Sequence, residues 1–172
     1  MFFSIQDLER RKIHFDTTFA PGEIQFLEDN LRQSGALAVN GTAELLVDTL
    51  GEIRVRGRVS GQMETECNRC LDPTFYQVDS SFDAYYRSAE TAPEDDEVRI
   101  DAGEAEIAFY EGEGVRLEDV LRDHILLQLP MQLICSEACK GICPHCGQNL
   151  NKGSCDCRRE MVDERWSALK NL

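Results

Sequence analysis

Residues 36–59 read ALAVNGTAELLVDTLGEIRVRGRV, and the spacing of the apolar residues in this stretch decides the fold class. Apolar side chains recur at every second position in two runs, first Ala43, Leu45 and Val47, then Ile53, Val55 and Val59. This period of two is typical of antiparallel strands that have one face in water. Residues 49–52, Thr-Leu-Gly-Glu, separate the two runs and predict the turn of a β-hairpin.

The same alternation predicts further strands on both sides of this hairpin. They lie at Phe15–Phe19, residues 76–86 and Glu106–Tyr110. The strand that starts at Glu52 is long, and Gly57 and Gly61 within it predict bends or bulges. We therefore expect an antiparallel sheet of five or more strands, either open or barrel-like.

Residues 117–129 predict the α-helix that covers this sheet. Their apolar stripe consists of Leu117, Val120, Leu121, Ile125 and Leu129. Glu118 and Asp119 lie in the first turn, where the helix dipole favours acids, and Pro130 ends the helix. Two shorter helices are expected, one at Glu23–Leu31 and one after Asp163. The fold class expected from these elements is α+β.

The composition is that of a globular chain. The 172 residues are 42% hydrophobic, which suits one domain or a domain with a small appendage. No apolar run approaches the roughly 18 residues that span a bilayer. Residues 1–12 lack the basic segment and cleavage site of a signal peptide. We therefore expect a cytoplasmic protein with no membrane partner.

The net charge of −14 restricts the possible partners, and residues 89–134 carry most of it. Sequence-independent binding of nucleic acid depends on cationic charge and is not expected here. An acidic body attracts basic partners, and ribosomal proteins are one such class. Solubility alone explains the charge equally well.

Six of the eight cysteines lie in residues 135–157, which read CSEACKGICPHCGQNLNKGSCDC. The eight form four pairs: Cys67 with Cys70, Cys135 with Cys139, Cys143 with Cys146, and Cys155 with Cys157. The gap of two residues between Cys143 and Cys146 lets both sulfurs point inward from one tight turn. Gly147 suits a left-handed conformation directly after that turn. Because cytosolic thiols stay reduced, such pairs indicate metal or redox chemistry.

Two structural zinc sites are predicted, each with four cysteine ligands. In the first division, a hairpin at residues 148–154 returns Cys155 and Cys157 to Cys143 and Cys146, in a zinc-ribbon-like module. The other set, Cys67, Cys70, Cys135 and Cys139, then ties the sheet to the chain that follows the helix. A second division stays open, in which Cys135, Cys139, Cys143 and Cys146 share one metal ion.

Other chemistries of the cysteines fit the sequence less well. Four disulfides require an export signal, which the sequence lacks. The spacings match neither ferredoxin pattern of iron–sulfur ligands. A catalytic zinc site keeps one ligand position open and usually has histidine or glutamate ligands. A thiol redox switch with a labile zinc ion stays open as an alternative.

Five basic side chains are candidates for contacts with RNA phosphates: Arg54, Arg56, Arg58, Lys140 and Lys152. The three arginines point to one face of a strand at intervals of about 6.6 Å, and the planar guanidinium group matches phosphate. Pairing with acids such as Glu44 or Asp48 explains the arginines equally well. The lysines would also soften the negative charge of a zinc ion held by four thiolates.

Several short motifs occur in a fixed order. They are Arg56-Gly57, Cys67-Asn-Arg-Cys70-Leu-Asp-Pro73, Leu117-Glu-Asp-Val-Leu121, Leu126-Leu127-Gln-Leu-Pro130, Cys139-Lys-Gly-Ile-Cys143-Pro-His-Cys146-Gly147, Asn149-Leu150-Asn151 and Cys155-Asp-Cys157. This order resembles the YceD family of bacterial and plastid proteins, described as large ribosomal RNA subunit accumulation proteins. The resemblance implies a role in accumulation or processing of the large-subunit ribosomal RNA, with no established enzymatic activity.

The resulting prediction is a β-rich region in residues 1–134 and a cysteine-rich module in residues 135–172, which form one folded unit. The sequence contains no P-loop, dinucleotide-binding turn or nucleophile elbow. We therefore expect a non-enzymatic assembly factor of the large ribosomal subunit that binds ribosomal RNA, a basic ribosomal protein or both, and no small-molecule substrate. A redox- or zinc-responsive regulator and an RNA-processing enzyme are the alternatives.

Overall fold

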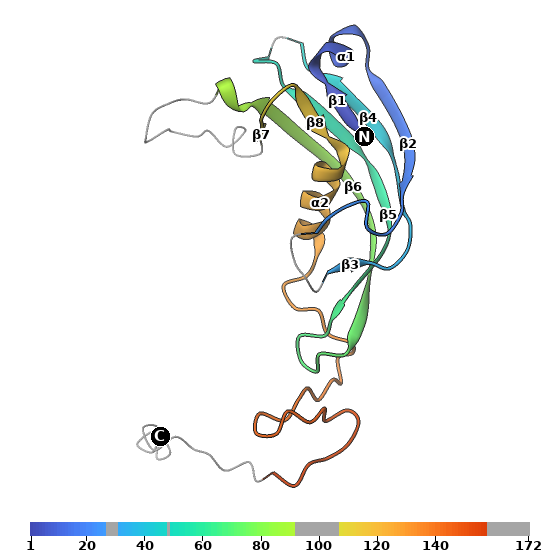
Figure 1. The fold of residues 1–172 in the computed structure, drawn as a ribbon, viewed down its shortest axis with the longest axis vertical. Helices are drawn as coiled ribbons and strands as arrows, with labels where there is room; N and C mark the ends of the chain where they lie inside the picture. The colour runs from blue at the N-terminus through green and yellow to red at the C-terminus, as the bar shows by residue number, and fades with distance from the viewer. Residues whose placement is uncertain (27–30, 48, 92–106, 158–172) are drawn as a thin grey trace, which may run out of the picture.

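The computed structural model describes residues 1–26, 31–47, 49–91 and 107–157, and a six-stranded sheet dominates it (Figure 1). The strands are β2 (Ile13–Phe19), β3 (Arg32–Gln33), β4 (Leu37–Leu45), β5 (Ile53–Glu66), β6 (Pro73–Ser88) and β7 (Ile107–Tyr110). Their order in the sheet is β2-β4-β5-β6-β7, and β3 pairs with β5. The strands β1 (Phe2–Ser4) and β8 (Gly114–Arg116) form a separate antiparallel pair.

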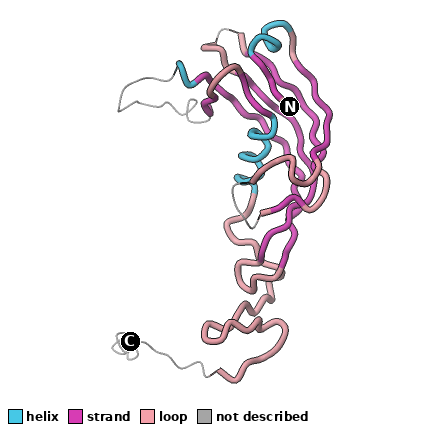
Figure 2. The backbone as a smooth tube through the Cα atoms, in the orientation of Figure 1, coloured by secondary structure: helices cyan, strands magenta, loops and turns pink. Residues whose placement is uncertain are grey.

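The described residues contain two α-helices beside these sheets, and Figure 2 colours the helical segments cyan. The helix α1 (Ile5–Arg10) begins after Ser4, whose hydroxyl accepts a hydrogen bond from the amide of Asp7. The helix α2 (Leu117–Gln128) lies against one face of the sheet and buries the apolar stripe that the sequence indicates. A short 3-10 turn, η1 (Ala89–Thr91), follows β6. Among the described residues, no helix is long and apolar enough to span a bilayer.

The hairpin predicted from residues 36–59 is confirmed. The amide of Leu46 donates to the carbonyl of Glu52 at 2.8 Å, and Gly51 in the turn has a φ of 77°. The alternation places one apolar side of β4 and β5 in the core, namely Leu37, Val39, Ala43, Ile53, Val55 and Val59. Val47 does not continue this pattern, because it follows the end of β4 and is 85% exposed.

Three expectations about the elements are wrong. The sheet is open and mixed, not barrel-like and antiparallel throughout, because β7 pairs with β6 in parallel. Alternation reports which face is buried and carries no information on strand direction. The register from Ile53 to Glu66 against β6 is unbroken, so of the bends or bulges expected in β5 the bulges are absent. Of the helix expected at Glu23–Leu31, the described residues 23–26 and 31 are not helical.

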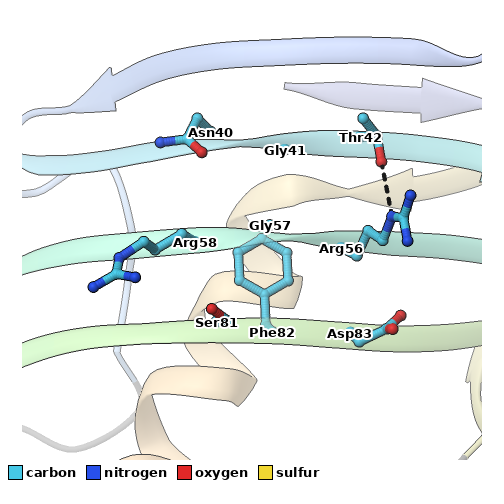
Figure 3. A pocket seen from close by; sticks show the side chains of 9 residues that line it. All are labelled: Asn40, Gly41, Thr42, Arg56, Gly57, Arg58, Ser81, Phe82 and Asp83. Atoms are coloured by element: carbon cyan, nitrogen blue, oxygen red, sulfur yellow. Dashed lines mark hydrogen bonds between the residues drawn. The ribbon is translucent and has the colours of Figure 1, made fainter.

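The glycines of β4 and β5 serve close packing. Gly41 lies directly opposite Gly57. A Cβ atom on Gly57 would lie 2.3 Å from the carbonyl oxygen of Asn40, and one on Gly41 would lie 2.2 Å from that of Arg56. Figure 3 shows the ring of Phe82 beside Gly57. The glycines thus permit a tight approach of backbone and aromatic ring in the middle of the sheet.

After α2 the chain returns to the turn between β5 and β6. The amide of Asn68 donates to the carbonyl of Leu133 at 2.8 Å, and the amide of Leu133 donates to Oδ1 of Asn68 at 2.6 Å. Residues 135–157 then form the cysteine-rich end of the molecule (Figure 1). The helix expected after Asp163 lies outside the described residues.

Candidate metal centres

The eight cysteines lie in two groups of four, and within each group the sulfur atoms lie within 4.8 Å of one another. The first tetrad is Cys67, Cys70, Cys135 and Cys139, and the second tetrad is Cys143, Cys146, Cys155 and Cys157. The first of the two predicted divisions is the one that these distances match. The structure does not group Cys135 and Cys139 with Cys143 and Cys146.

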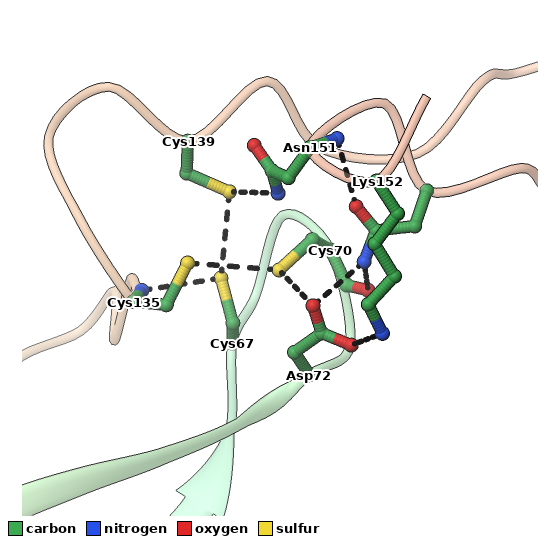
Figure 4. A network of polar contacts seen from close by, with 8 residues as sticks. Cys67, Cys70, Asp72, Cys135, Cys139, Asn151 and Lys152 are labelled. Atoms are coloured by element: carbon green, nitrogen blue, oxygen red, sulfur yellow. Dashed lines mark hydrogen bonds and ion pairs between the residues drawn. The ribbon is translucent and has the colours of Figure 1, made fainter. Parts of the chain in front are cut away.

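The first tetrad joins two distant parts of the chain (Figure 4). Cys67 and Cys70 lie in the turn between β5 and β6, whereas Cys135 and Cys139 follow α2. The distance between the sulfur atoms of Cys67 and Cys139 is 3.9 Å, and that between Cys70 and Cys135 is 3.7 Å. Four sulfurs at about 2.3 Å from a tetrahedral ion are separated by about 3.8 Å, whereas a disulfide requires about 2.05 Å. The residues present therefore fit a tetrahedral metal ion.

Hydrogen bonds to the sulfurs of this tetrad favour thiolates. The amide of Cys135 donates to Sγ of Cys67 at 3.3 Å, and Nδ2 of Asn151 donates to Sγ of Cys139 at 3.4 Å. Burial raises the pKa of Cys67, but backbone donors outweigh it and lower this pKa to about 6. For Cys70 the amide of Asp72 lowers the pKa, whereas burial and the neighbouring thiols raise it to about 12. Four thiolates therefore need a cation between them.

The second tetrad has the same arrangement in a more exposed position. Cys143 is buried, Cys146 is exposed, and Cys155 and Cys157 are half-buried. Hydrogen bonds from the amides of Cys146 and His145 lower the pKa of Cys143 to about 6. The sulfur of Cys146 and burial raise the pKa of Cys157 to about 12. This tetrad has the same donor chemistry as the first and less protection from water.

The turns that carry Cys67 and Cys143 have the same backbone hydrogen bonds. The amide of Leu71 donates to the carbonyl of Cys67 at 2.9 Å, and the amide of Gly147 donates to that of Cys143 at the same distance. Each first cysteine donates its own amide to the carbonyl five residues later at 2.8 Å. Gly147 has a φ of 73°, as predicted, and Leu71 has a φ of 61°. Leu71 therefore adopts a conformation that usually requires glycine.

The hairpin of the second tetrad packs on the turn of the first. The amide of Ile142 donates to the carbonyl of Arg69 at 3.0 Å. Both Asn149 and Lys152 donate to the carboxylate of Asp72, each at 2.7 Å (Figure 4). Through these contacts the second tetrad packs against the β5–β6 turn, and the first tetrad fixes the conformation of that turn.

Comparison with known proteins gives the family of this chain. The family model described as large ribosomal RNA subunit accumulation protein YceD matches residues 55–172. The chain belongs to the YceD family. An uncharacterized protein of Mycobacterium tuberculosis is 30% identical over 158 residues, which cover 91% of this chain and 72% of that protein. The uncharacterized protein YlbN of Bacillus subtilis is 26% identical over 172 residues, which cover 99% of this chain and 93% of YlbN.

A plant relative matches a shorter segment. The large ribosomal RNA subunit accumulation protein YCED homolog 1, chloroplastic, of Arabidopsis thaliana is 48% identical over 52 residues. This segment covers 30% of the present YceD-family chain and 16% of the plant protein. No solved structure matches the chain.

In this YceD-family chain, the three arginines of β5 lie on the sheet face opposite the core. Carboxylates form ion pairs with two of them, Arg54 and Arg58. Arg54 donates to both carboxylate oxygens of Asp83, at 2.8 and 2.5 Å, and Arg58 donates to Asp79 at 2.9 Å. These acids come from β6. Glu44, which the sequence suggested, lies opposite Arg54 on β4, and the other suggested acid, Asp48, lies outside the described residues. Contact of the arginines with RNA stays a prediction.

The other candidates for RNA contacts, Arg56, Lys140 and Lys152, differ in the side chains that they contact. Figure 3 shows Arg56 beside a shallow hollow, where its Nε lies 3.5 Å from the hydroxyl of Thr42. Glu44 accepts a hydrogen bond from Lys12 at 2.8 Å. Lys152 pairs with Asp72, and the side chain of Lys140 is exposed. Arg56 lies opposite Asp83 in the register of β5 and β6. Arg54 and also Arg56 lower the pKa of Asp83, and Lys12 and also Arg56 lower the pKa of Glu44, so carboxylates lie near all three arginines of this face.

Replacing Leu71 with glycine is expected to preserve both tetrads and to stabilise the chain by up to about 1 kcal/mol. Glycine adopts positive φ without steric cost, and the leucine side chain is 57% exposed, so little packing is lost. Urea denaturation of the two proteins measures the difference. Leu50→Gly, an exposed leucine in the β4–β5 turn, is the control and should destabilise. Destabilisation by Leu71→Gly would contradict the strain that we assign to this residue.

Replacing Asp72 with alanine is expected to lower the urea midpoint of unfolding. The substitution leaves the donors of Asn149 and Lys152 without their acceptor, and the hairpin that carries them loses hydrogen bonds to a carboxylate. Glu137→Ala, which removes an exposed acid between Cys135 and Cys139, is the control. Equal stability of the two variants in urea would show that the hairpin does not depend on this contact.

Sequence reasoning missed Leu71, Asp72 and the side chains of Asn149 and Asn151 as parts of the site. The signal was present for all four residues, since the motifs Cys67-Asn-Arg-Cys70-Leu-Asp-Pro73 and Asn149-Leu150-Asn151 both belong to the family pattern. Their roles were invisible in the sequence because Asn149 and Asn151 contact residues about 80 and 12 positions away.

Proposed function

We propose that this chain is a non-enzymatic factor that supports accumulation of the large-subunit ribosomal RNA. The observation that carries the proposal is the family match over residues 55–172, which include all eight cysteines. The matched family is described by this role, and so is the chloroplast relative. The factor acts by binding ribosomal RNA, a basic protein of the large subunit, or both.

Both tetrads hold zinc in this proposal. Four thiolates are ligands that zinc prefers, and they fill a tetrahedral site completely. The first ion closes the long loop of residues 71–134, and zinc binding worth roughly 10–16 kcal/mol in small peptides offsets the entropy of that closure. The ions act as structural ties, so residues 1–134 and 135–172 fold as one unit. A filled site has no place for a hydrolytic water, so the tetrads give no support to an RNA-processing enzyme.

The charges favour a basic protein over RNA as the direct partner. The chain has a net charge of −14, and Arg54, Arg58 and Lys152 already pair with carboxylates of the same chain. Binding of RNA through phosphates would require these pairs to break or to be shared. A basic ribosomal protein instead meets the complementary net charge of the whole chain.

A redox- or zinc-responsive regulator is the second candidate. The exposure of Cys146 and the partial exposure of Cys155 and Cys157 favour it, because accessible thiolates are the ones that oxidants reach. Mild peroxide should then release zinc from the second tetrad before the first and change partner binding. Unchanged zinc content after peroxide would exclude this candidate.

Removal of the gene from its host tests the proposed function. We expect the ratio of large-subunit to small-subunit ribosomal RNA to fall, and the wild-type gene to restore it. A gene that encodes Cys67→Ser should fail to restore the ratio. An unchanged ratio in the deletion strain would contradict the proposal, whatever the chain binds in vitro.

A further inference from the structure

A hollow of about 450 Å³ lies between β7, β8 and the first turns of α2. Figure 1 shows these elements away from the cysteine-rich residues 135–157. Its walls are aromatic. Phe2 and Phe109 are about half exposed, at 49% and 52%, whereas Tyr86 and Tyr110 are buried against the core. Exposed phenylalanines at the edge of one hollow indicate a surface that binds something.

The rim of this hollow is acidic. Glu111, Asp119 and Asp123 line it together with Arg116 and Arg122. Arg122 donates to Asp119 at 2.8 Å and to Asp123 at 3.2 Å, so one guanidinium serves two carboxylates. The rim therefore carries a surplus of negative charge.

The raised pKa values of the two buried tyrosines reflect this negative charge. Burial, together with the carboxylates of Asp123 and Asp119, raises the pKa of Tyr86 to about 12, although Arg122 acts in the opposite direction. Burial and Glu90 raise the pKa of Tyr110. The interior of the hollow thus combines aromatic faces with a negative potential, which is the environment that attracts a cationic side chain.

We propose that this hollow binds a basic peptide segment of the protein partner, with an arginine or lysine seated between Phe2 and Phe109, where it shares the carboxylates of Asp119 and Asp123 with Arg122. The proposal rests on the proposed function and names the partner class for it. Cation–π contact with the rings and ion pairs with the rim act together on one cation. The net charge of −14 steers such a segment towards the chain. RNA, whose phosphates the acidic rim repels, is not the occupant.

Fluorescence anisotropy with a labelled peptide of alternating arginine and leucine tests the proposal on the full chain. We expect binding that weakens with salt and a much weaker signal for the matching peptide of glutamate and leucine. Asp119→Asn/Asp123→Asn should weaken binding about tenfold, and Phe109→Ala roughly threefold to tenfold. The control Asp16→Asn/Glu64→Gln makes the same change of charge on β2 and β5, away from the hollow, and should bind as the wild type does.

Three results would overturn the proposal: equal binding of the two peptides, equal affinity of the rim variant and the control, or binding of labelled oligouridine to the chain that the rim substitutions change. A melting temperature equal to the wild type shows that each variant folds. The deletion strain separates this proposal from the function on which it rests. If deletion lowers the large ribosomal RNA and the rim variant restores it fully, the hollow is not the site although the function stands.

Discussion

Replacing Cys67 with serine is expected to release metal from both tetrads, whereas Cys157→Ser is expected to release it from the second tetrad alone. Cys67 is fully buried, and its sulfur lies 3.9 Å from that of Cys139. Loss of this ligand opens the tie between the β5–β6 turn and the segment after α2. The hairpin of the second tetrad packs on that turn through Asp72, so it loses its support as well.

The free energy of unfolding should fall by several kcal/mol in Cys67→Ser, out of a total of roughly 5–15 kcal/mol for a domain. The loss in Cys157→Ser should be clearly smaller, because Cys157 is half-buried at the end of the described chain. Zinc content by mass spectrometry and urea denaturation measure the two effects. Ser154→Ala, beside the second tetrad, is the control. Loss of a single ion in both variants would show that the tetrads are independent.

Replacing Gly57 with alanine is expected to destabilise the sheet by about 2–4 kcal/mol. The new methyl group would lie 2.3 Å from the carbonyl oxygen of Asn40 and 3.0 Å from the ring of Phe82 (Figure 3). A backbone carbonyl in a paired strand has little freedom to move away, so β4 and β5 must separate. Thermal and urea denaturation followed by circular dichroism give the measurement.

Gly35→Ala is the matched control for this substitution. No heavy atom lies within 4 Å of a Cβ built at Gly35, so alanine there should be neutral or slightly stabilising through a more restricted unfolded chain. Equal stability of the two alanine variants would contradict the close approach of β4 and β5 at Gly41 and Gly57.

The sequence predicted the elements whose signal is local. Alternation gave β4, β5 and β6, and the apolar stripe gave α2 to within one residue of Gln128. The parallel pairing of β7 was not predictable, because direction depends on the path of the chain between strands. The bulges expected at Gly57 and Gly61 failed for a related reason. Glycine serves bulges and close packing alike, and only the opposite strand decides between them.

The same difference between local and long-range signals applies to the candidate site. Cysteine spacing predicted the two tetrads as sets, since two-residue gaps and a short hairpin are local features. Asp72 became visible only in the fold, because its partners Asn149 and Lys152 are distant in sequence. The arginines of β5 point to one face as predicted, but their pairing with Asp79 and Asp83 required the register of β6.

The central claim is that the eight thiols hold two zinc ions in sites without an open ligand position and thereby tie residues 135–157 to the β5–β6 turn. X-ray absorption at the zinc edge of the purified chain tests it most directly. We predict a first shell of four sulfur atoms per zinc at about 2.3 Å, with no lighter ligand. A shell that contains nitrogen or oxygen, or a chain that purifies without zinc, would contradict the account.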